Sequence, residues 1–153
     1  MDEEQQRGFM YLALLEGRKA LPGCVPNPPV GCVLVREGSV IAKGHTNSPG
    51  GNHAEAMALS LLSGPLTDVA AFVTLEPCSF HGRTPSCAQA LVQRGIARVY
   101  ISILDPDPRN NGAGVKILER AGIEVSLGLL QDIARSELGP YLARKDHVPP
   151  SRS

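Results

Sequence analysis

Residues 69–78 read VAAFVTLEPC, an apolar run that stops at a glutamate, a proline and a cysteine. The run has the length of a strand, and its adjacent apolar residues are typical of a strand covered on both faces. Downstream, the patterns predict a helix over 84–94, a strand over 98–104, a helix over 114–121 and a strand over 124–127. This alternation predicts an α/β sandwich with helices on both faces of its sheet.

The sequence before residue 69 adds a hairpin to this pattern. We expect a helix around 9–16, a proline-rich loop over 22–29, and strands over 30–35 and 40–44 joined by a turn at 36–39. A helix over 53–62 then leads to the strand at 69. The predicted fold is a three-layer α/β/α sandwich around a five-stranded mixed sheet.

The end of the chain defines the expected domain boundary. A closing helix is predicted over 129–143, with an interruption near Gly139 and Pro140. We expect one domain over residues 1–144 and a flexible tail over residues 145–153.

Composition excludes several classes of function. The chain has 153 residues, with 15 Lys and Arg against 15 Asp and Glu, and it lacks Trp. Without clustered basic or stacking aromatic residues, we expect no nucleic-acid partner. The apolar runs are too short to cross a membrane, and the acidic N-terminus is unlike a signal peptide, so we expect a cytoplasmic protein. In that compartment cysteines serve as thiols or metal ligands, and we expect Cys24 to be a loop thiol and Cys32 a core thiol.

Three potential metal ligands occupy the ends of predicted elements. His53 begins one helix, Cys78 follows the strand at 69–75, and Cys87 lies near the start of the next helix. One histidine and two cysteines suit zinc and leave a fourth position for water, as in catalytic sites. At a helix start, Glu55 can lie beside the metal without binding it, free to transfer a proton.

Each of these residues also has a structural interpretation. Asn52 followed by Glu55 fits a capping box, and Thr84 followed by Pro85 fits a helix start. The two cysteines could be buried thiols, and a single histidine is more often structural than a ligand. As a set, however, His-x-Glu followed by Pro-Cys and a further Cys is typical of zinc deaminases.

The segments around these residues resemble one branch of the cytidine-deaminase-like superfamily. HGRTPSC at 81–87, with eight residues between the two cysteines, is similar to the His-Gly-Arg-Thr-Pro-Pro-Cys segment of the riboflavin-biosynthesis pyrimidine deaminases. PNPPVGC at 26–32, TLEPC at 74–78, DPDP at 105–108 and GAG at 112–114 also fit that branch. The resemblance covers residues 9–130 and implies the cytidine-deaminase-like fold.

The resemblance also implies a reaction, its cofactor and its partners. The family converts 2,5-diamino-6-ribosylamino-4(3H)-pyrimidinone 5′-phosphate, a small-molecule aminopyrimidine, into the corresponding uracil and ammonia, with Zn2+ as cofactor. Many members carry a reductase as well, and superfamily members commonly form homo-oligomers, either dimers or tetramers. We therefore expect a homo-oligomer and a possible separate reductase partner.

Residue roles carry over by position within the matching segments. The resemblance implies that His53, Cys78 and Cys87 bind zinc, that Glu55 is catalytic, that Asn27 contacts the base, that Asp105 lies on the ribose side, and that His81, Arg83 and Thr84 hold the phosphate or ribose. A guanidinium suits a phosphate because it can donate two parallel hydrogen bonds. Structural interpretations stay open: Asn27 and Asp105 could be turn residues, and Arg83 a solvated charge.

Three positions depart from the family pattern. Thr46 follows His45 where the family has a substrate-contacting histidine, Asp107 replaces an asparagine, and Ala113 replaces a basic residue. These changes remove positive or donor groups from the phosphate end, which favours, as an alternative, a zinc deaminase of another amino-heterocycle or nucleoside. A second alternative is a non-catalytic, zinc-stabilised partner subunit, although retention of Glu55 argues against it. A nucleic-acid deaminase is disfavoured by charge and aromatic content.

Overall fold

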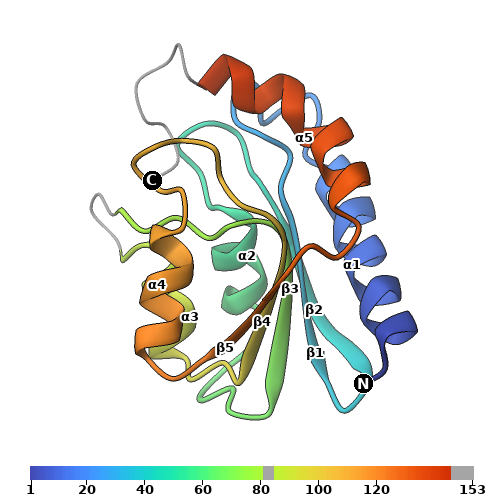
Figure 1. The fold of residues 1–153 in the computed structure, drawn as a ribbon, viewed down its shortest axis with the longest axis vertical. Helices are drawn as coiled ribbons and strands as arrows, with labels where there is room; N and C mark the ends of the chain where they lie inside the picture. Colours follow the sequence, from blue (N-terminus) through green and yellow to red (C-terminus); the bar gives the residue numbers. More distant parts are fainter. Residues whose placement is uncertain (81–84, 146–153) are drawn as a thin grey trace.

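The computed structural model describes residues 1–80 and 85–145. Its helices are α1 (Glu3–Arg18), α2 (Ala54–Ser60), α3 (Cys87–Gln93), α4 (Ala113–Arg120) and α5 (Gln131–Lys145), and its strands are β1 (Gly31–Arg36), β2 (Ser39–His45), β3 (Val69–Leu75), β4 (Arg98–Ile103) and β5 (Glu124–Leu127) (Figure 1). Within these residues, no helix combines the length and apolar character needed to span a membrane. The expected order of elements is confirmed.

The strands form one mixed sheet in the order β2-β1-β3-β4-β5. β1 runs antiparallel to both β2 and β3, whereas β3, β4 and β5 are parallel. Because β3 and β4 are parallel neighbours, the loops that follow them leave the same edge of the sheet. Cys78 and Asp105 lie in these two loops.

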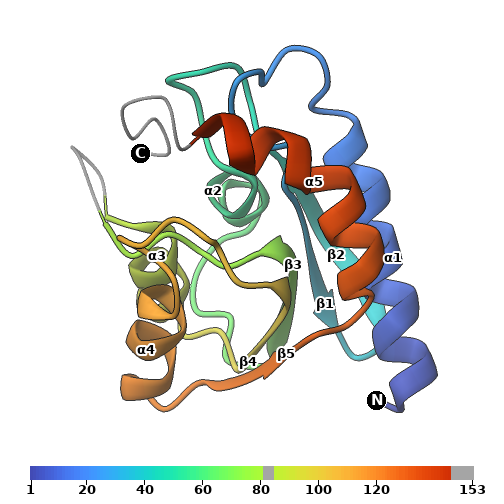
Figure 2. The same ribbon diagram turned by 45° about the horizontal axis from the view of Figure 1, so that its top comes forward.

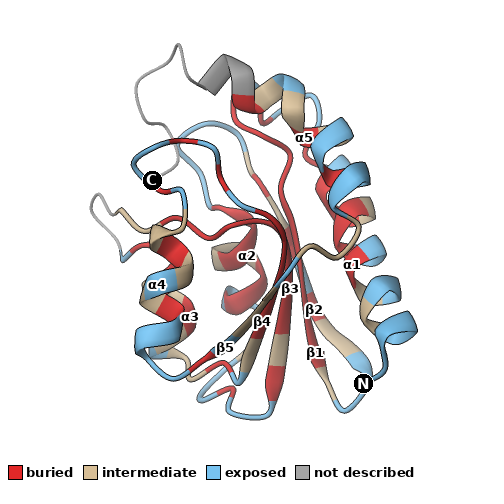
Figure 3. Ribbon diagram, viewed as in Figure 1, coloured by how far each residue is buried: buried red, intermediate tan, exposed pale blue. Residues whose placement is uncertain are grey.

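Helices cover both faces of the sheet, as predicted. α1 and α5 lie on one face, and α2, α3 and α4 lie on the other (Figures 1 and 2). Alternate residues of β1 enter two different clusters, Cys32 and Leu34 in one and Val33 and Val35 in the other. Figure 3 shows that burial follows the central strands and the sheet-facing sides of the helices. The three-layer sandwich therefore has apolar packing on both sides of its sheet.

The first helix starts earlier than its apolar spacing predicts. Asp2 accepts a hydrogen bond from the backbone N–H of Gln5, and the Gln5 side chain accepts one from the backbone N–H of Asp2. This reciprocal capping box satisfies backbone donors that the first turn leaves without helical partners. The cap therefore extends α1 to Glu3, six residues before Phe9.

The predicted interruption of the last helix at Gly139 and Pro140 is wrong. α5 continues through Pro140 to Lys145, the first residue of the expected tail, and residues 146–153 lie outside the described residues. A proline inside a helix removes one backbone hydrogen bond, at a cost of about 3 kcal/mol. Ala134, Leu138 and Leu142, spaced four residues apart, are all buried in the core on either side of this position. Their packing offsets the local cost.

The first helix and the first strand touch through their backbones. A Cβ atom at Gly31 would lie 1.8 Å from the carbonyl oxygen of Ala13, and one at Gly17 would lie 2.6 Å from the carbonyl oxygen of Pro29. Neither distance allows a side chain. Glycine at both positions lets α1 lie directly on the start of β1.

Candidate metal centre and active site

His53, Cys78 and Cys87 form one buried cluster, with ligand atoms that lie within 4.8 Å of one another. The Nδ1 atom of His53 is 3.0 Å from the Sγ atom of Cys87 and 3.8 Å from that of Cys78. Two sulfurs facing one imidazole nitrogen make a donor set of the softness that zinc prefers. The residues present therefore fit a zinc ion, as predicted.

Helix starts deliver two of these ligands. His53 is the N-cap residue of α2 with extended backbone dihedrals (φ −74°, ψ 166°), and Cys87 is the first residue of α3. Cys87 also donates a backbone hydrogen bond to the Sγ atom of Cys78 over 3.3 Å. The backbone of one candidate ligand thus helps to orient the sulfur of another.

The two capping interpretations of the sequence fail. Because the N-cap of α2 is His53, the third helical residue is Ala56, and Asn52 with Glu55 cannot form a capping box there. The second interpretation placed Pro85 as the first residue of the next helix. Instead, α3 begins at Cys87 and its N-cap is Ser86, which accepts a hydrogen bond from the backbone N–H of Gln89 over 3.2 Å.

Glu55 is fully buried in the first turn of α2. Burial, together with the nearby Glu55 carboxylate, raises the pKa of the Cys32 thiol well above its usual range. Burial also raises the pKa of the Cys24 thiol, which lies in the loop between α1 and β1, as predicted, with its side chain buried. Both cysteines therefore stay protonated at neutral pH, and neither belongs to the metal cluster.

A small cavity of about 60 Å³ adjoins the metal cluster. His53, Cys78 and Cys87 line it together with Phe80 and Ser86. A larger cavity of about 750 Å³ lies between the ends of β4 and β5 and helix α5, away from the three ligands. The larger cavity contains none of the three candidate ligands in its lining, so cavity size does not identify the metal site. The cavity beside the ligands is the one with suitable chemistry.

The loop that carries Asn27 is fixed by Thr46. Asn27 is buried, and its backbone N–H donates to the carbonyl oxygen of Cys24 over 2.8 Å, so it takes part in a turn. The hydroxyl of Thr46 donates to the carbonyl oxygen of Pro28 and accepts from the backbone N–H of Val30. Thr46 thus has a structural task at the position where the family has a histidine.

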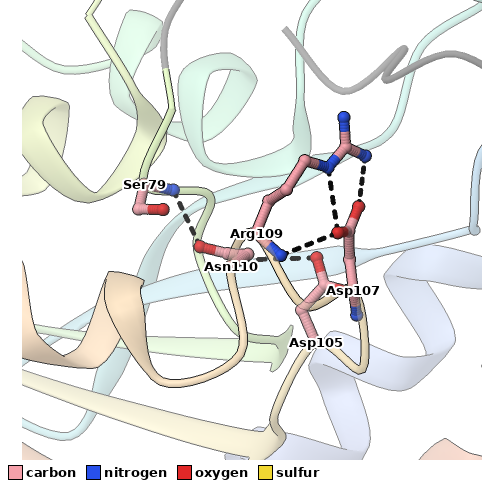
Figure 4. Close-up of polar contacts among 5 residues, drawn as sticks. All are labelled: Ser79, Asp105, Asp107, Arg109 and Asn110. Atoms are coloured by element: carbon pink, nitrogen blue, oxygen red, sulfur yellow. Dashed lines mark hydrogen bonds and ion pairs between the residues drawn. The ribbon is translucent and has the colours of Figure 1, made fainter.

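The loop after β4 folds around its own acidic side chains (Figure 4). Asp105 is fully buried and accepts a hydrogen bond from the backbone N–H of Asp107 over 3.0 Å. Asp107 accepts from both the backbone and the guanidinium of Arg109, and this pairing raises the pKa of that guanidinium. The Arg109 guanidinium lies 5.3 Å from the centre of the Phe80 ring. Asp107 therefore holds a cation against a residue that lines the metal cavity.

Sequence reasoning missed two side chains that join the loops after β3 and β4. Glu76 accepts hydrogen bonds from the backbone N–H groups of Asp105, Gly112 and Val115, each over 3.1 Å. Asn110 accepts from the backbone N–H of Ser79 over 2.9 Å. A glutamate at the end of an apolar strand was a usable signal for the first. Nothing local marks Asn110. His81, Arg83 and Thr84 lie outside the described residues.

Known proteins with similar sequences and structures include several deaminases. The riboflavin biosynthesis protein RibD of Escherichia coli is 44% identical over 140 residues, which cover 92% of this chain but 38% of that protein. A diaminohydroxyphosphoribosylamino-pyrimidine deaminase of Buchnera aphidicola is 44% identical over 69% of this chain and 71% of its own length. The crystal structure of a diaminohydroxyphosphoribosylaminopyrimidine deaminase/5-amino-6-(5-phosphoribosylamino)uracil reductase from Thermotoga maritima superposes with a TM-score of 0.82 at 35% identity, over 93% of this chain and 42% of that one.

The structural likeness confirms the expected fold. Residues 3–103 match the model described as the cytidine and deoxycytidylate deaminase zinc-binding region. That match includes all three residues that the fold gathers into one buried cluster. The chain therefore belongs to the zinc-binding cytidine and deoxycytidylate deaminase family.

Proposed function

We propose that this chain deaminates 2,5-diamino-6-ribosylamino-4(3H)-pyrimidinone 5′-phosphate to the corresponding uracil, with release of ammonia. The buried His53, Cys78 and Cys87 cluster, with Glu55 buried in the same first turn as His53, is the observation that carries the proposal. The names of the Buchnera and Thermotoga relatives support this substrate.

In this proposal His53, Cys78 and Cys87 hold the metal and Glu55 moves the protons. Bound zinc supplies the acidity that makes a water molecule nucleophilic near neutral pH. Glu55 accepts a proton from the water that adds to the amino-bearing ring carbon. It delivers this proton to the ring nitrogen, then takes the remaining proton of the added hydroxyl and gives it to the amino group, so that the carbonyl forms, the C–N bond breaks and ammonia leaves. A buried carboxylate that is not a ligand suits this transfer.

Substrate contacts form the next part of the proposal. Asn27 would contact the base and Asp105 the ribose side, while His81, Arg83 and Thr84 would hold the phosphate or ribose. The Asp107 carboxylate, which departs from the family pattern, is paired with Arg109 and so adds no net negative charge at its position. A phosphorylated substrate is supported by the names of the Buchnera and Thermotoga relatives.

Partners follow from the same relatives. The name of the Thermotoga protein joins a deaminase and a uracil reductase, so we propose that the uracil product passes to a reductase. We also propose a homo-oligomer, in line with the superfamily, and a cytoplasmic location. Size measurement by light scattering tests the assembly.

Ammonia release tests the proposed reaction. Zinc-loaded protein should release ammonia from the diaminopyrimidinone ribosyl phosphate, and Glu55→Gln should lower the rate by about 10²–10⁴-fold, the usual contribution of a general acid–base group. Glu119→Gln, an exposed carboxylate on α4, is the matched control and should keep the parental rate.

Two results would redirect the proposal. Equal rates on the phosphorylated and dephosphorylated compounds would favour the alternative of another amino-heterocycle. If Glu55→Gln matched the parent in every assay, the non-catalytic subunit would be the better explanation.

A further inference from the structure

The loop that carries Cys78 is attached to the loop after β4 by two buried side chains that reach in opposite directions. Glu76, at the start of the Cys78 loop, accepts three backbone hydrogen bonds from residues 105, 112 and 115. Asn110, in the other loop, reaches back to the residues around Cys78. Both side chains are fully buried, so water does not compete for these bonds.

Asn110 contacts the backbone on both sides of the metal ligand. Its Oδ1 atom accepts from the backbone N–H of Ser79 over 2.9 Å (Figure 4). Its Nδ2 atom donates to the carbonyl oxygen of Pro77 over 3.3 Å. One rigid amide thus holds the residue before Cys78 and the residue after it.

The same nitrogen reaches the ribose-side carboxylate. Nδ2 of Asn110 lies 3.3 Å from Oδ2 of Asp105. An amide provides an acceptor at one end and two donors at the other, which matches one N–H group, one carbonyl oxygen and one carboxylate oxygen. Neither a carboxylate nor an aliphatic side chain of similar size can satisfy all three.

We propose that Asn110 is a positioning residue that sets the direction of the Cys78 sulfur and fixes Asp105 relative to the Cys78 loop. The proposal rests on the assignment of Cys78 as a metal ligand in the proposed function. It extends that function by linking metal retention to a loop that contributes no ligand. Outer-shell partners of metal ligands act in this way by fixing ligand orientation.

The test compares Asn110→Leu and Asn110→Asp with Asn111→Leu, the exposed neighbour in the same loop. Cobalt(II) is the probe, because its thiolate absorption bands report the geometry at the sulfurs. Affinity is measured by competition with a chromophoric chelator. Hydrogen exchange at the Ser79 amide and melting of the metal-free proteins are measured in parallel.

We expect Asn110→Leu to weaken cobalt binding by about tenfold, the low end for loss of an outer-shell partner. Its cobalt spectrum should change, and its Ser79 amide should exchange faster. Asn110→Asp keeps the acceptor for Ser79 but loses both donor contacts, so its Ser79 amide should stay protected while the spectrum still changes. Asn111→Leu should match the parent in cobalt affinity, cobalt spectrum and Ser79 exchange.

The proposal is overturned if both Asn110 variants bind cobalt with parental affinity and spectrum. It is also overturned if Asn111→Leu changes both to the same extent as the Asn110 variants, because the effect would then belong to the loop as a whole. Cobalt binding requires no substrate, so an incorrect substrate assignment would leave these results valid. Absence of any cobalt–thiolate band in the parent would instead remove the metal site from the proposed function.

Discussion

The two ends of the sheet hold their polar groups in different ways. At the end where β3 and β4 finish, polar side chains are buried and bond mainly to backbone, as Glu76 and Asn110 do. At the opposite end, Arg36 pairs with Asp68 and Arg98 with Glu124, and all four side chains are substantially exposed. A buried polar group that loses its partner costs far more than an exposed ion pair contributes. The first end should therefore be sensitive to substitution and the second tolerant.

The sharpest way to separate the two ends is to remove a ligand. Cys87→Ser should lower zinc affinity by more than about 100-fold, beyond what loss of an outer-shell partner costs. Ammonia release should disappear with the metal. Cys24→Ala removes another buried thiol and is the control, because Cys24 lies outside the cluster. Equal zinc loss in both variants would mean that general loosening of the fold, and not ligand removal, is responsible.

A smaller effect is expected from the carboxylate that joins the two loops. Glu76→Gln places an amide NH2 group against backbone donors and should lower the free energy of unfolding by about 1–3 kcal/mol, the cost of an unsatisfied buried group. Denaturant unfolding of the metal-free protein measures this change. Glu124→Gln at the opposite end is the matched control, with an expected change below about 0.5 kcal/mol. Similar losses in the two variants would remove the distinction between the ends.

Acid should lower the free energy of unfolding by protonating Glu16, a residue of α1 that contacts His45 at the end of β2. Burial raises the pKa of this carboxyl, but hydrogen bonds from His45 and Lys19 outweigh burial and leave the pKa below its ordinary value of 4.5. A folded-state pKa below the unfolded one adds stability above about pH 4.5, and this stability is lost as pH falls through the lower value.

Unfolding free energies between pH 6 and pH 3 provide the measurement. The parent should lose stability more steeply than Glu16→Gln over the acidic part of this range. Glu4→Gln, an exposed position of the same helix, should follow the parent. Parallel curves for the parent and Glu16→Gln would show that the contacts with His45 and Lys19 do not stabilise the folded state.

The smallest effect belongs to the exposed pairs. Arg36→Ala breaks a 2.9 Å contact with Asp68 and should cost less than about 1 kcal/mol, a difference that 1 M salt should reduce further. Melting curves at low and high salt measure it. A loss of several kcal/mol that is independent of salt would contradict the comparison.

The metal site was predictable because each candidate ligand lies next to a helix start or a strand end that the local sequence pattern predicts. His53 and Cys87 belong to helix starts, and Cys78 follows a continuous apolar run, so local patterns placed all three near element ends. Their similarity to the zinc-deaminase pattern then indicated that the three residues form one site. The order of strands and helices followed from periodicity in the same way.

What the sequence could not reveal depends on contacts between distant residues. Asn110 and Ser79 are 31 positions apart, and no spacing rule relates them. Pro140 suggested a break in the last helix, but burial of Leu138 and Leu142 beside it outweighs the local preference. Similarly, the structural role of Thr46 depends on hydrogen bonds between its hydroxyl and the backbone of Pro28 and Val30, which are distant in sequence.

The contact between Gly31 and Ala13 limits how this sequence can vary. With 1.8 Å between a hypothetical Cβ atom and a carbonyl oxygen, position 31 admits one amino acid, whereas the neighbouring aliphatic positions of β1 can exchange within a volume range. In a library that randomises every codon, survivors should retain glycine there even under selection for folding alone. An invariant glycine at this position would reflect the close packing of a helix on the sheet and not a role in catalysis, although it lies within the same motif as residues of the proposed active site.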